Sequence, residues 1–407
     1  MFANRPPTLP PVAAEAREHS KRVAAALAQA IRGAGGALEF GRYMEICLYA
    51  PDLGYYVAGA DKLGAGGDFV TAPEISPLFG RCLARQVEDL LVATEADSVL
   101  EFGAGSGRLA ADLLAELARR GALPRRYCIL ELGAELRQRQ AAALANLVPE
   151  LMDRVQWLER LPEPGFRGVM LANELLDALP VRRFRVTEQG PRPLAVAVSE
   201  DGFEWRLAAE ETGITVAVRA IETALGRRLD LGYESEYSEQ IPAWMRSVGE
   251  RLAAGALLLI DYGYTRAEYY HPERDRGTLL CHFRHRAHFD PLILPGIQDI
   301  SASVDFTAVA EAGIGAGLDL AGYTSQAWFL LGSGLEQVLL EVGAPESADY
   351  LEAAGQAKQL TLPGEMGERF QVLAFTRGIR QPLRGFSLHD RRDRLAIAEG
   401  PWFPALH

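Results

Sequence analysis

The stretch Val99–Leu109 constrains the fold of this chain more than any other segment. An apolar run typical of a short buried strand contains the acidic residue Glu101. Glycines follow at the alternate positions Gly103, Gly105 and Gly107, and helix-forming residues come directly afterwards. Glycine lets the backbone of such a turn pass close to a ligand, where a side chain would collide. The next helix N-terminus offers free N–H groups to an anionic group. The stretch therefore predicts a strand–turn–helix unit that binds a nucleotide-like cofactor.

Two acidic residues indicate which cofactor this turn binds. Gly105–Ala110 also fits the G-x-G-x-x-A pattern of dinucleotide sites, so NAD or FAD stays an alternative, as does a plain turn without a ligand. Glu101 brings negative charge to the turn, which disfavours a diphosphate and favours the cationic amine or sulfonium of S-adenosylmethionine. Tyr127–Glu131 is typical of a second buried strand, and its last residue, Glu131, is able to accept both ribose hydroxyls of an adenosine. We therefore predict S-adenosylmethionine, held by Glu101, Glu131 and the three glycines.

Strands and helices alternate along the chain from Ser98 onward. This order is typical of an α/β fold with a doubly wound, mostly parallel sheet. The expected core strands are Val99–Phe102, Ile129–Glu131, Val155–Leu158, Gly168–Ala172 and Leu257–Asp261, with a terminal strand at 369–377. Helices are expected before them, at about 13–32, 40–49 and 76–91.

The alternation is interrupted after the fourth expected core strand. Arg183–Val186, Leu194–Val198 and Phe203–Leu207 are short β-type runs separated by Gly, Pro and Asp turns, and they predict an inserted β-rich lobe. Ligands of open α/β sheets bind at the carboxyl ends of the strands, so we expect the lobe to cover the substrate. The predicted organisation is a helical N-terminal region with a cofactor- and substrate-facing loop (1–95), the first part of the core (96–180), the lobe (181–240) and the completion of the core with substrate-facing loops (241–407).

Composition and charge exclude several classes of function. The chain has 407 residues and 48% hydrophobic residues, enough for a core domain and a second lobe. Its net charge of −12 argues against general binding to nucleic acid. The four cysteines are scattered without CxxC pairs, the longest apolar runs are too short to span a bilayer, and the first residues lack the apolar segment of a signal peptide. We therefore expect a cytoplasmic protein.

Three polar residues directly follow the fourth expected core strand. Asn173, Glu174 and Asp177 lie at the ligand-facing end of an apolar strand, where polar groups are costly unless they line a cleft or are paired. One interpretation makes Glu174 and Asp177 acids at a helix start, stabilised by the helix dipole. The other places both carboxylates beside the transferred methyl group, where they clamp a planar cationic acceptor. We predict Glu174 and Asp177 as catalytic residues and Asn173 as a cofactor contact.

The segment 66–76 is a second candidate wall of the site. Its acids and hydroxyls stand among glycines, as in a loop that closes over a polar ligand. Asp68 is a reserve candidate for the carboxylate clamp, and Thr71 and Glu74 are candidate substrate contacts. The alternative is a plain turn followed by an N-cap at Ser76.

A cluster of histidines follows Cys281. A thiol and imidazoles lie close together in the run 281–288, but Arg284 and Arg286 between them would repel a cation, so no metal site is predicted. A substrate-facing loop is the favoured interpretation, with His282 and His285 as substrate contacts and a simple solvated loop as the alternative. The acids expected to balance its charge are Asp290, Asp299 and Asp305, of which Asp305 is also a candidate substrate contact.

Nearly the whole chain resembles the MidA-type family of S-adenosylmethionine-dependent methyltransferases, to which the arginine-methylating assembly factor of mitochondrial complex I belongs. The motifs that carry the resemblance are 67–74 (GDFVTAPE), 101–107 (EFGAGSG), 173–181 (NELLDALPV), 260–263 (IDYG), 268–272 (EYYHP), 277–282 (GTLLCH) and 304–307 (VDFT). The run 299–303 departs from the family pattern, in which threonine and histidine are expected.

The resemblance implies a class I methyltransferase fold, which is Rossmann-like, and S-adenosylmethionine as methyl donor. It also implies a protein arginine as acceptor in one branch of the family, and hence a protein substrate. Two alternatives stay open: an assembly or scaffolding factor that binds the cofactor without turnover, and an NAD-dependent oxidoreductase.

Overall fold

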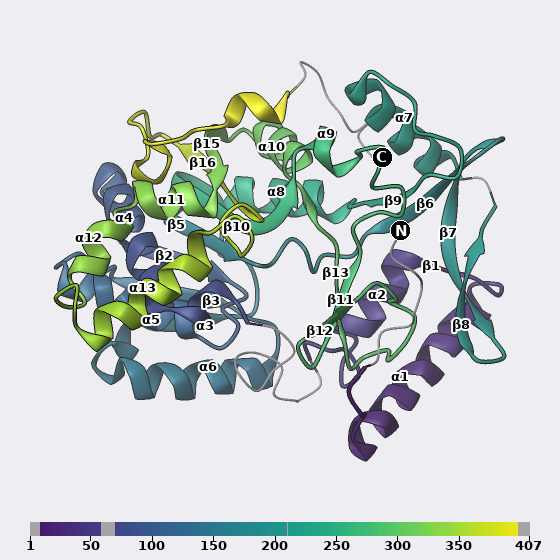
Figure 1. The fold of residues 1–407 in the computed structure, drawn as a ribbon, viewed down its shortest axis with the longest axis horizontal. Coiled ribbons are helices and arrows are strands. Elements are labelled where there is room, and N and C mark those ends of the chain that lie inside the picture. The colour runs from purple at the N-terminus through teal and green to yellow at the C-terminus, as the bar shows by residue number, and fades with distance from the viewer. Residues whose placement is uncertain (1–8, 58–69, 210, 398–407) are drawn as a thin grey trace.

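The computed structural model describes residues 9–57, 70–209 and 211–397. Two parts lie side by side in Figure 1: a large sheet flanked by helices, and a smaller lobe built from antiparallel strands and the N-terminal helices. The chain enters through the lobe, at α1 (Ala14–Gly33) and α2 (Phe40–Tyr49), and builds four of the eight described strands of the large sheet before it returns to the lobe.

The large sheet has the strand order β15-β16-β10-β5-β2-β3-β4, and β14 (Val304–Asp305) pairs with β10. The strands from β10 to β4 are parallel, whereas β16 is antiparallel to both of its neighbours. The doubly wound, mostly parallel fold predicted from the sequence is therefore confirmed. The strands are β2 (Ser98–Phe102), β3 (Arg126–Leu130), β4 (Val155–Leu158), β5 (Phe166–Asn173), β10 (Leu252–Tyr264), β15 (Asp319–Ser325) and β16 (Phe370–Arg377).

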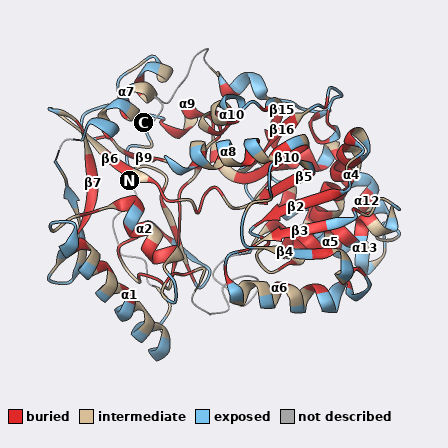
Figure 2. Cartoon of the chain, turned by 180° about the vertical axis from the view of Figure 1, so that it is seen from behind, coloured by how far each residue is buried: buried red, intermediate tan, exposed pale blue. Residues whose placement is uncertain are grey.

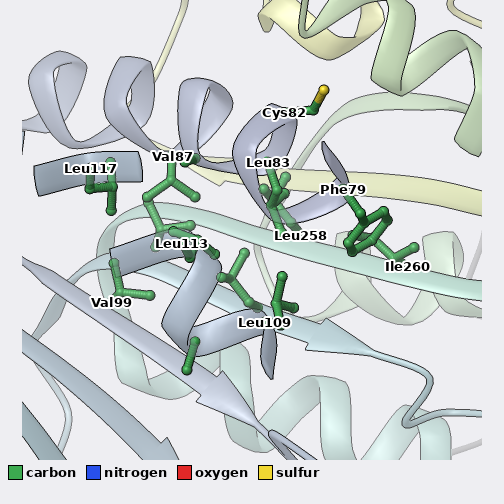
Figure 3. Close-up of a cluster of buried hydrophobic side chains, with 14 of the residues drawn as sticks. Phe79, Cys82, Leu83, Val87, Val99, Leu109, Leu113, Leu117, Leu258 and Ile260 are labelled. Carbon is green, nitrogen blue, oxygen red and sulfur yellow. The ribbon is translucent and has the colours of Figure 1, made fainter. Parts of the chain in front are cut away.

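Both faces of this sheet are covered by helices, and its strands are largely buried (Figure 2). Alternate residues of one strand therefore enter two different cores. Leu258 and Ile260 of β10 pack against α4 and α5 on one face, where Figure 3 shows them beside Phe79. Leu257 and Leu259 face α8 and α10 on the other face. The helices flanking the sheet are α3 (Ala72–Ile75), α4 (Pro77–Thr94), α5 (Arg108–Arg119), α6 (Ala134–Leu147), α8 (Gln240–Arg251), α10 (Phe306–Gly315), α11 (Gln326–Gly332), α12 (Leu335–Leu340) and α13 (Ala348–Thr361).

The lobe is built on an antiparallel sheet with the order β1-β7-β6-β9, to which β8 is added through β7. Its three predicted strands are present, but two further strands were missed: the two-residue β1 and the polar β9. The elements are β1 (Leu38–Glu39), β6 (Arg182–Thr187), β7 (Gly190–Ser199), β8 (Gly202–Leu207), α7 (Thr212–Leu225) and β9 (Glu234–Tyr237). Because β1 pairs with β7, the N-terminal region and the inserted segment share one sheet.

A three-stranded sheet, β12-β11-β13, joins the lobe to the large sheet. It consists of β11 (Leu280–Phe283), β12 (Arg286–His288) and β13 (Asp299–Ser301), and the short helix α9 (Arg266–Tyr269) precedes it. Cys281 and Ile300 of this sheet are fully buried in the same core as α1 and α2. The histidine-rich run is therefore part of a packed sheet.

Candidate active site

A cavity of about 380 Å³ lies at the carboxyl ends of β2, β3 and β5. Its wall has two ends of different chemistry. The glycine-loop end consists of Glu101, Gly103, Gly105 and Glu131. The acidic end consists of Asn173 and Glu174 after β5 and of the tyrosines Tyr49 and Tyr56. Among the described residues that line the cavity, none is a lysine, an arginine or a histidine.

The glycine loop has the backbone conformation that its sequence requires. Gly103, Gly105 and Gly107 have φ values of +62°, +55° and +85°, in the left-handed region where residues with a side chain are strained. A Cβ on Gly107 would also lie 3.3 Å from Cα of Gln140 in α6. Helix α5 begins at Arg108, so its N-terminus follows the loop directly.

Glu101 lies at the glycine-loop end and is 2% exposed. The hydroxyl of Tyr127 donates a hydrogen bond of 2.7 Å to its Oε2. Burial raises the pKa of Glu101 to about 7, although the hydrogen bond from Tyr127 opposes this effect. A cationic ligand beside Glu101 would favour the ionised carboxylate.

Glu131 follows β3 and is held in place by polar contacts to both of its oxygens. Oε1 accepts from the N–H of Gly133 (2.9 Å), and Oε2 accepts from Nε2 of Gln140 (3.1 Å). The same Gln140 amide donates to the carbonyl of Gly105 (3.1 Å), and the indole of Trp157 donates to Oε1 of Gln140 (3.0 Å). Gln140 thus fixes the acid and the glycine loop relative to each other. Each carboxylate oxygen keeps capacity for a second donor, such as a ribose hydroxyl.

The turn after β5 holds the carboxylate of Glu174 in the cavity wall. Glu174 has φ +52°, an uncommon conformation for a residue with a side chain, and its N–H donates to the carbonyl of Ile260 (2.9 Å). Nδ2 of Asn173 donates to Oε1 of Glu174 (3.2 Å), while the buried Oδ1 of Asn173 has no hydrogen-bond partner in the described structure. Burial and the nearby carboxylate of Asp177 raise the pKa of Glu174 to about 8.

Asp261, at the end of the sheet in β10, supports this turn. Its Oδ2 accepts from the N–H groups of Leu175, Leu176 and Asp177 at 2.9–3.2 Å. Burial and the charge of Glu174 raise the pKa of Asp261 to about 8. The three N–H groups point to a positioning role for Asp261, which fixes the backbone between the two predicted catalytic acids.

Asp177 lies behind the cavity wall, where it is 8% exposed. Burial and the carboxylates of Asp261 and Asp299 raise its pKa well above the usual range. Its Oδ1 is buried without a hydrogen-bond partner in the described structure. Glu174, Asp177, Asp261 and Asp299 therefore form a group of carboxylates that interact unfavourably with one another.

Tyrosines surround these carboxylates. Tyr56 donates to Oδ1 of Asp299 (2.7 Å), and its ring stacks on that of Tyr49 at 5.7 Å. Tyr262, which follows Asp261 in β10, is buried against Asp177. Burial and the nearby acids raise the pKa values of these phenols well above 10, so all three keep their protons near neutral pH. The tyrosines offer hydroxyl groups but no positive charge.

The candidate loop 66–76 is described only from residue 70 onward, and Asp68 lies outside the described residues. Thr71 and Glu74 both line the cavity. Glu74 accepts a hydrogen bond from the hydroxyl of Ser106, so it is tied to the glycine loop. The backbone N–H of Ala72 donates to Glu174, which connects this segment to the acidic end.

Three predicted substrate contacts lie elsewhere. Asp305 caps α10 by accepting from the N–H of Ala308 (3.1 Å), and it pairs with Arg266 (3.3 Å). Its carboxylate therefore stabilises the start of α10, directly after β14. His285 occupies the exposed turn between β11 and β12, with φ +59°. His282 is also outside the cavity wall and lies beside Asp299, at 4.0 Å between Nδ1 and Oδ2. His282 and His285 belong to the β11–β12 hairpin and Asp305 caps α10, and none of the three lines the cavity.

The described residues contain no group of three or more His, Cys, Asp or Glu side chains that could hold a metal ion. No helix of the described chain is long and apolar enough to cross a membrane.

The family model of an S-adenosyl-L-methionine-dependent methyltransferase matches residues 80–324. The chain belongs to this family. A crystal structure from Burkholderia thailandensis with bound S-adenosyl-homocysteine is 45% identical and has a TM-score of 0.89, over 95% of this chain and all of that one. S-adenosylmethionine is therefore the cofactor, and the dinucleotide alternative is not supported.

Two relatives with assigned names match over most of their length. Both are called "Protein arginine methyltransferase NDUFAF7, mitochondrial". The one from Mus musculus is 31% identical over 83% of this chain and 81% of its own length, and the one from Danio rerio is 30% identical over 84% of each. These relatives are named as mitochondrial proteins, so the expectation of a cytoplasmic protein is contradicted.

Sequence reasoning missed several residues of the site. Tyr49 ends an expected helix and Tyr56 lies outside the expected helices and strands, and nothing in the sequence indicates that either reaches the cavity. Gln140 lies inside a helix, and nothing in its sequence context connects it with Glu131. Asp261 was recognised only as the end of a strand; the pairing of β10 with β5 is what brings it beneath the turn after β5.

Proposed function

We propose that this methyltransferase acts on arginine side chains of proteins. The observation that carries the proposal is the acidic end of the cavity, where Glu174 and Asp177 interact with each other and no described cation lines the wall. A guanidinium group is planar, always charged and carries five N–H donors, so it would relieve this repulsion. The names of the mouse and zebrafish relatives support the same acceptor.

An unpartnered oxygen in the cavity wall supports the same proposal. Oδ1 of Asn173 is a buried acceptor without a described donor, and such an atom is costly unless a ligand supplies one. A guanidinium bound against Glu174 offers additional N–H groups in the same plane. A neutral hydroxyl or thiol acceptor would leave the carboxylates without a compensating charge.

The residues of the glycine-loop end are proposed to hold the cofactor. Glu131 would accept the ribose hydroxyls, Glu101 would lie near the cationic methionyl part, and Gly103, Gly105 and Gly107 would allow the backbone to approach. When bound, S-adenosylmethionine supplies a methyl group activated by a positively charged sulfur. Glu174, in the cavity wall, would hold the guanidinium directly, and Asp177, behind the wall, would stabilise it by its negative charge. One nitrogen of the guanidinium would then face the cofactor, and this alignment is the main catalytic contribution expected.

The proposal is tested by incubating the purified protein with methyl-labelled S-adenosylmethionine and total protein from cells that lack it. Complete hydrolysis and amino-acid analysis then identify the labelled residue. The expected label is methylarginine. Label in another amino acid would show methyl transfer to a different acceptor and overturn the proposal.

A scaffolding role without turnover is distinguished by a separate comparison. Gly105→Val is expected to bind the cofactor poorly. If this variant is folded and restores full function in cells lacking the protein, methyl transfer is dispensable. If it fails to do so, catalysis is required.

A further inference from the structure

We propose that Asp299 and His282 carry the proton that methyl transfer releases from the acidic end to solvent. The inference rests on the proposed function, because it takes the acceptor to be a guanidinium bound beside Glu174. It assigns a role to a carboxylate and an imidazole that lie outside the cavity wall, on the adjacent strands β13 and β11.

The reaction requires such a route. A new N–CH3 bond replaces an N–H bond of the acceptor, the S–CH3 bond breaks, and its electron pair stays on sulfur. The guanidinium enters and leaves with one positive charge, so one proton must be removed for each methyl group transferred. The proton leaves a pocket lined by carboxylates that are themselves buried, and therefore needs a path to solvent.

Tyr56 connects the cavity to Asp299. Its ring lines the cavity, and its hydroxyl donates to Oδ1 of Asp299 at 2.7 Å. A hydroxyl both donates and accepts, so Tyr56 is able to receive a proton from the acceptor nitrogen while it passes its own to Asp299. This exchange leaves the phenol neutral, in keeping with its raised pKa.

Asp299 in turn lies beside His282. The two residues are directly paired between β11 and β13, with 4.0 Å between Nδ1 and Oδ2. A single bridging water or a small rotation of the imidazole closes this separation. Asp299 is 3% exposed, whereas the side chain of His282 is 25% exposed, so the pair joins the buried end to the surface. Histidine exchanges protons near neutral pH, which suits the last position of such a route.

The groups that face Asp299 come from five other segments of the chain. Tyr49 and Tyr56 approach from the end of α2 and the segment after it, and Tyr262 approaches from β10. Asp177 and Glu174 belong to the turn after β5, and Cys281 and His282 belong to β11. Of the titratable groups just named, His282 alone is an imidazole.

The test compares His282→Ala and Asp299→Asn with the unchanged protein. Single-turnover transfer of label to total protein from cells lacking this protein is measured from pH 6 to pH 9. We expect each variant to be slower near pH 7 by about 10-fold or more, with unchanged S-adenosylhomocysteine affinity. Added imidazole should accelerate His282→Ala in a saturable way and leave Asp299→Asn slow, because the carboxylate link is still missing in that variant.

His389→Gln is the matched control, because the ring of His389 packs on Trp328 and takes no part in the proposed proton route. A His282→Ala variant with the unchanged rate and pH profile would overturn the proposal. So would a slow variant that imidazole does not rescue and whose pH profile keeps its shape, since that result indicates a structural role. If the unchanged protein yields no methylarginine, the proposed function fails instead, before any variant is compared.

Discussion

The two ends of the cavity differ in how completely their carboxylates are paired with hydrogen-bond donors of the protein. At the glycine-loop end, Glu131 accepts from Gly133 and Gln140, and Glu101 accepts from Tyr127. At the acidic end, Glu174 and Asp177 lie within reach of each other's charge, and an oxygen of Asp177 has no described donor. The first end is organised by hydrogen bonds within the protein, whereas we propose that the second is completed by a bound cation.

This contrast follows from the fold. The glycine-loop end is built by β2, β3 and α6, which lie close together in the sequence and are linked by the Gln140 hydrogen bonds. The acidic end combines distant segments: the turn after β5, the end of α2 and the strand β13. Polar groups from separate segments meet there, and their hydrogen bonds leave buried oxygens of Asn173 and Asp177 without a donor in the described structure. Proteins keep such an arrangement mainly at functional sites.

The largest effect is expected when the glycine-loop end is changed. Gly105→Val places a β-branched residue at φ +55°, which strains the loop that the cofactor approaches. Calorimetry should show S-adenosylhomocysteine affinity reduced by about 100-fold or more. Gly121→Val is the matched control, because Gly121 has φ +71° with open space around it after α5. Equal affinity in the two variants would contradict the assigned role of the loop.

A smaller and different effect is expected at the acidic end. Glu174→Gln and Asp177→Asn keep the shape of each side chain but remove the negative charge that a guanidinium requires. The single-turnover rate of methyl transfer should fall about 10- to 100-fold in each, as expected for the loss of a charge-assisted hydrogen bond at Glu174 and of a nearby negative charge at Asp177. S-adenosylhomocysteine affinity should change little. Unchanged rates in both folded variants would exclude the carboxylate clamp.

The smallest effect concerns stability without ligands. The folded protein holds protons on Glu174 and Asp261, whose pKa values of about 8 exceed those of the unfolded chain. More protons are bound in the folded state between about pH 4.5 and pH 8, so the free energy of unfolding should fall as pH rises through this window. Thermal unfolding at pH 5.5 and 8.5 measures the fall in Tm. The fall in Tm should be smaller in Glu174→Gln. An equal fall in that variant would show that Glu174 does not contribute to the pH dependence of stability.

The sequence predicted the glycine-loop end far better than the acidic end. Glu101, Glu131 and the glycines lie at the ends of consecutive parallel strands, where local pattern and the rules of α/β sheets determine their position. Glu174 was found for the same reason, because it directly follows β5.

The rest depends on contacts between distant segments. Tyr56 and Asp299 are 243 positions apart, and their hydrogen bond requires α2 to pack against β13. The pairing of β1 with β7 likewise joins an N-terminal segment to the inserted one. The misplacement of His285 and Asp305 has a related cause: chemistry-bearing residues near each other in sequence were taken to share a site, whereas β11 and β12 form a hairpin and Asp305 begins a helix.

The most direct test measures the binding of ethylguanidinium to the complex with S-adenosylhomocysteine, by calorimetry at pH 7 in buffers of different ionisation enthalpy. Glu174 has a pKa of about 8 and is largely protonated at this pH. A bound cation lowers that pKa, so binding should release protons to the buffer. Release should be smaller in Glu174→Gln. If ethylguanidinium binds without releasing protons, and binds equally well to Glu174→Gln, the claim that the acidic end binds a cation is contradicted.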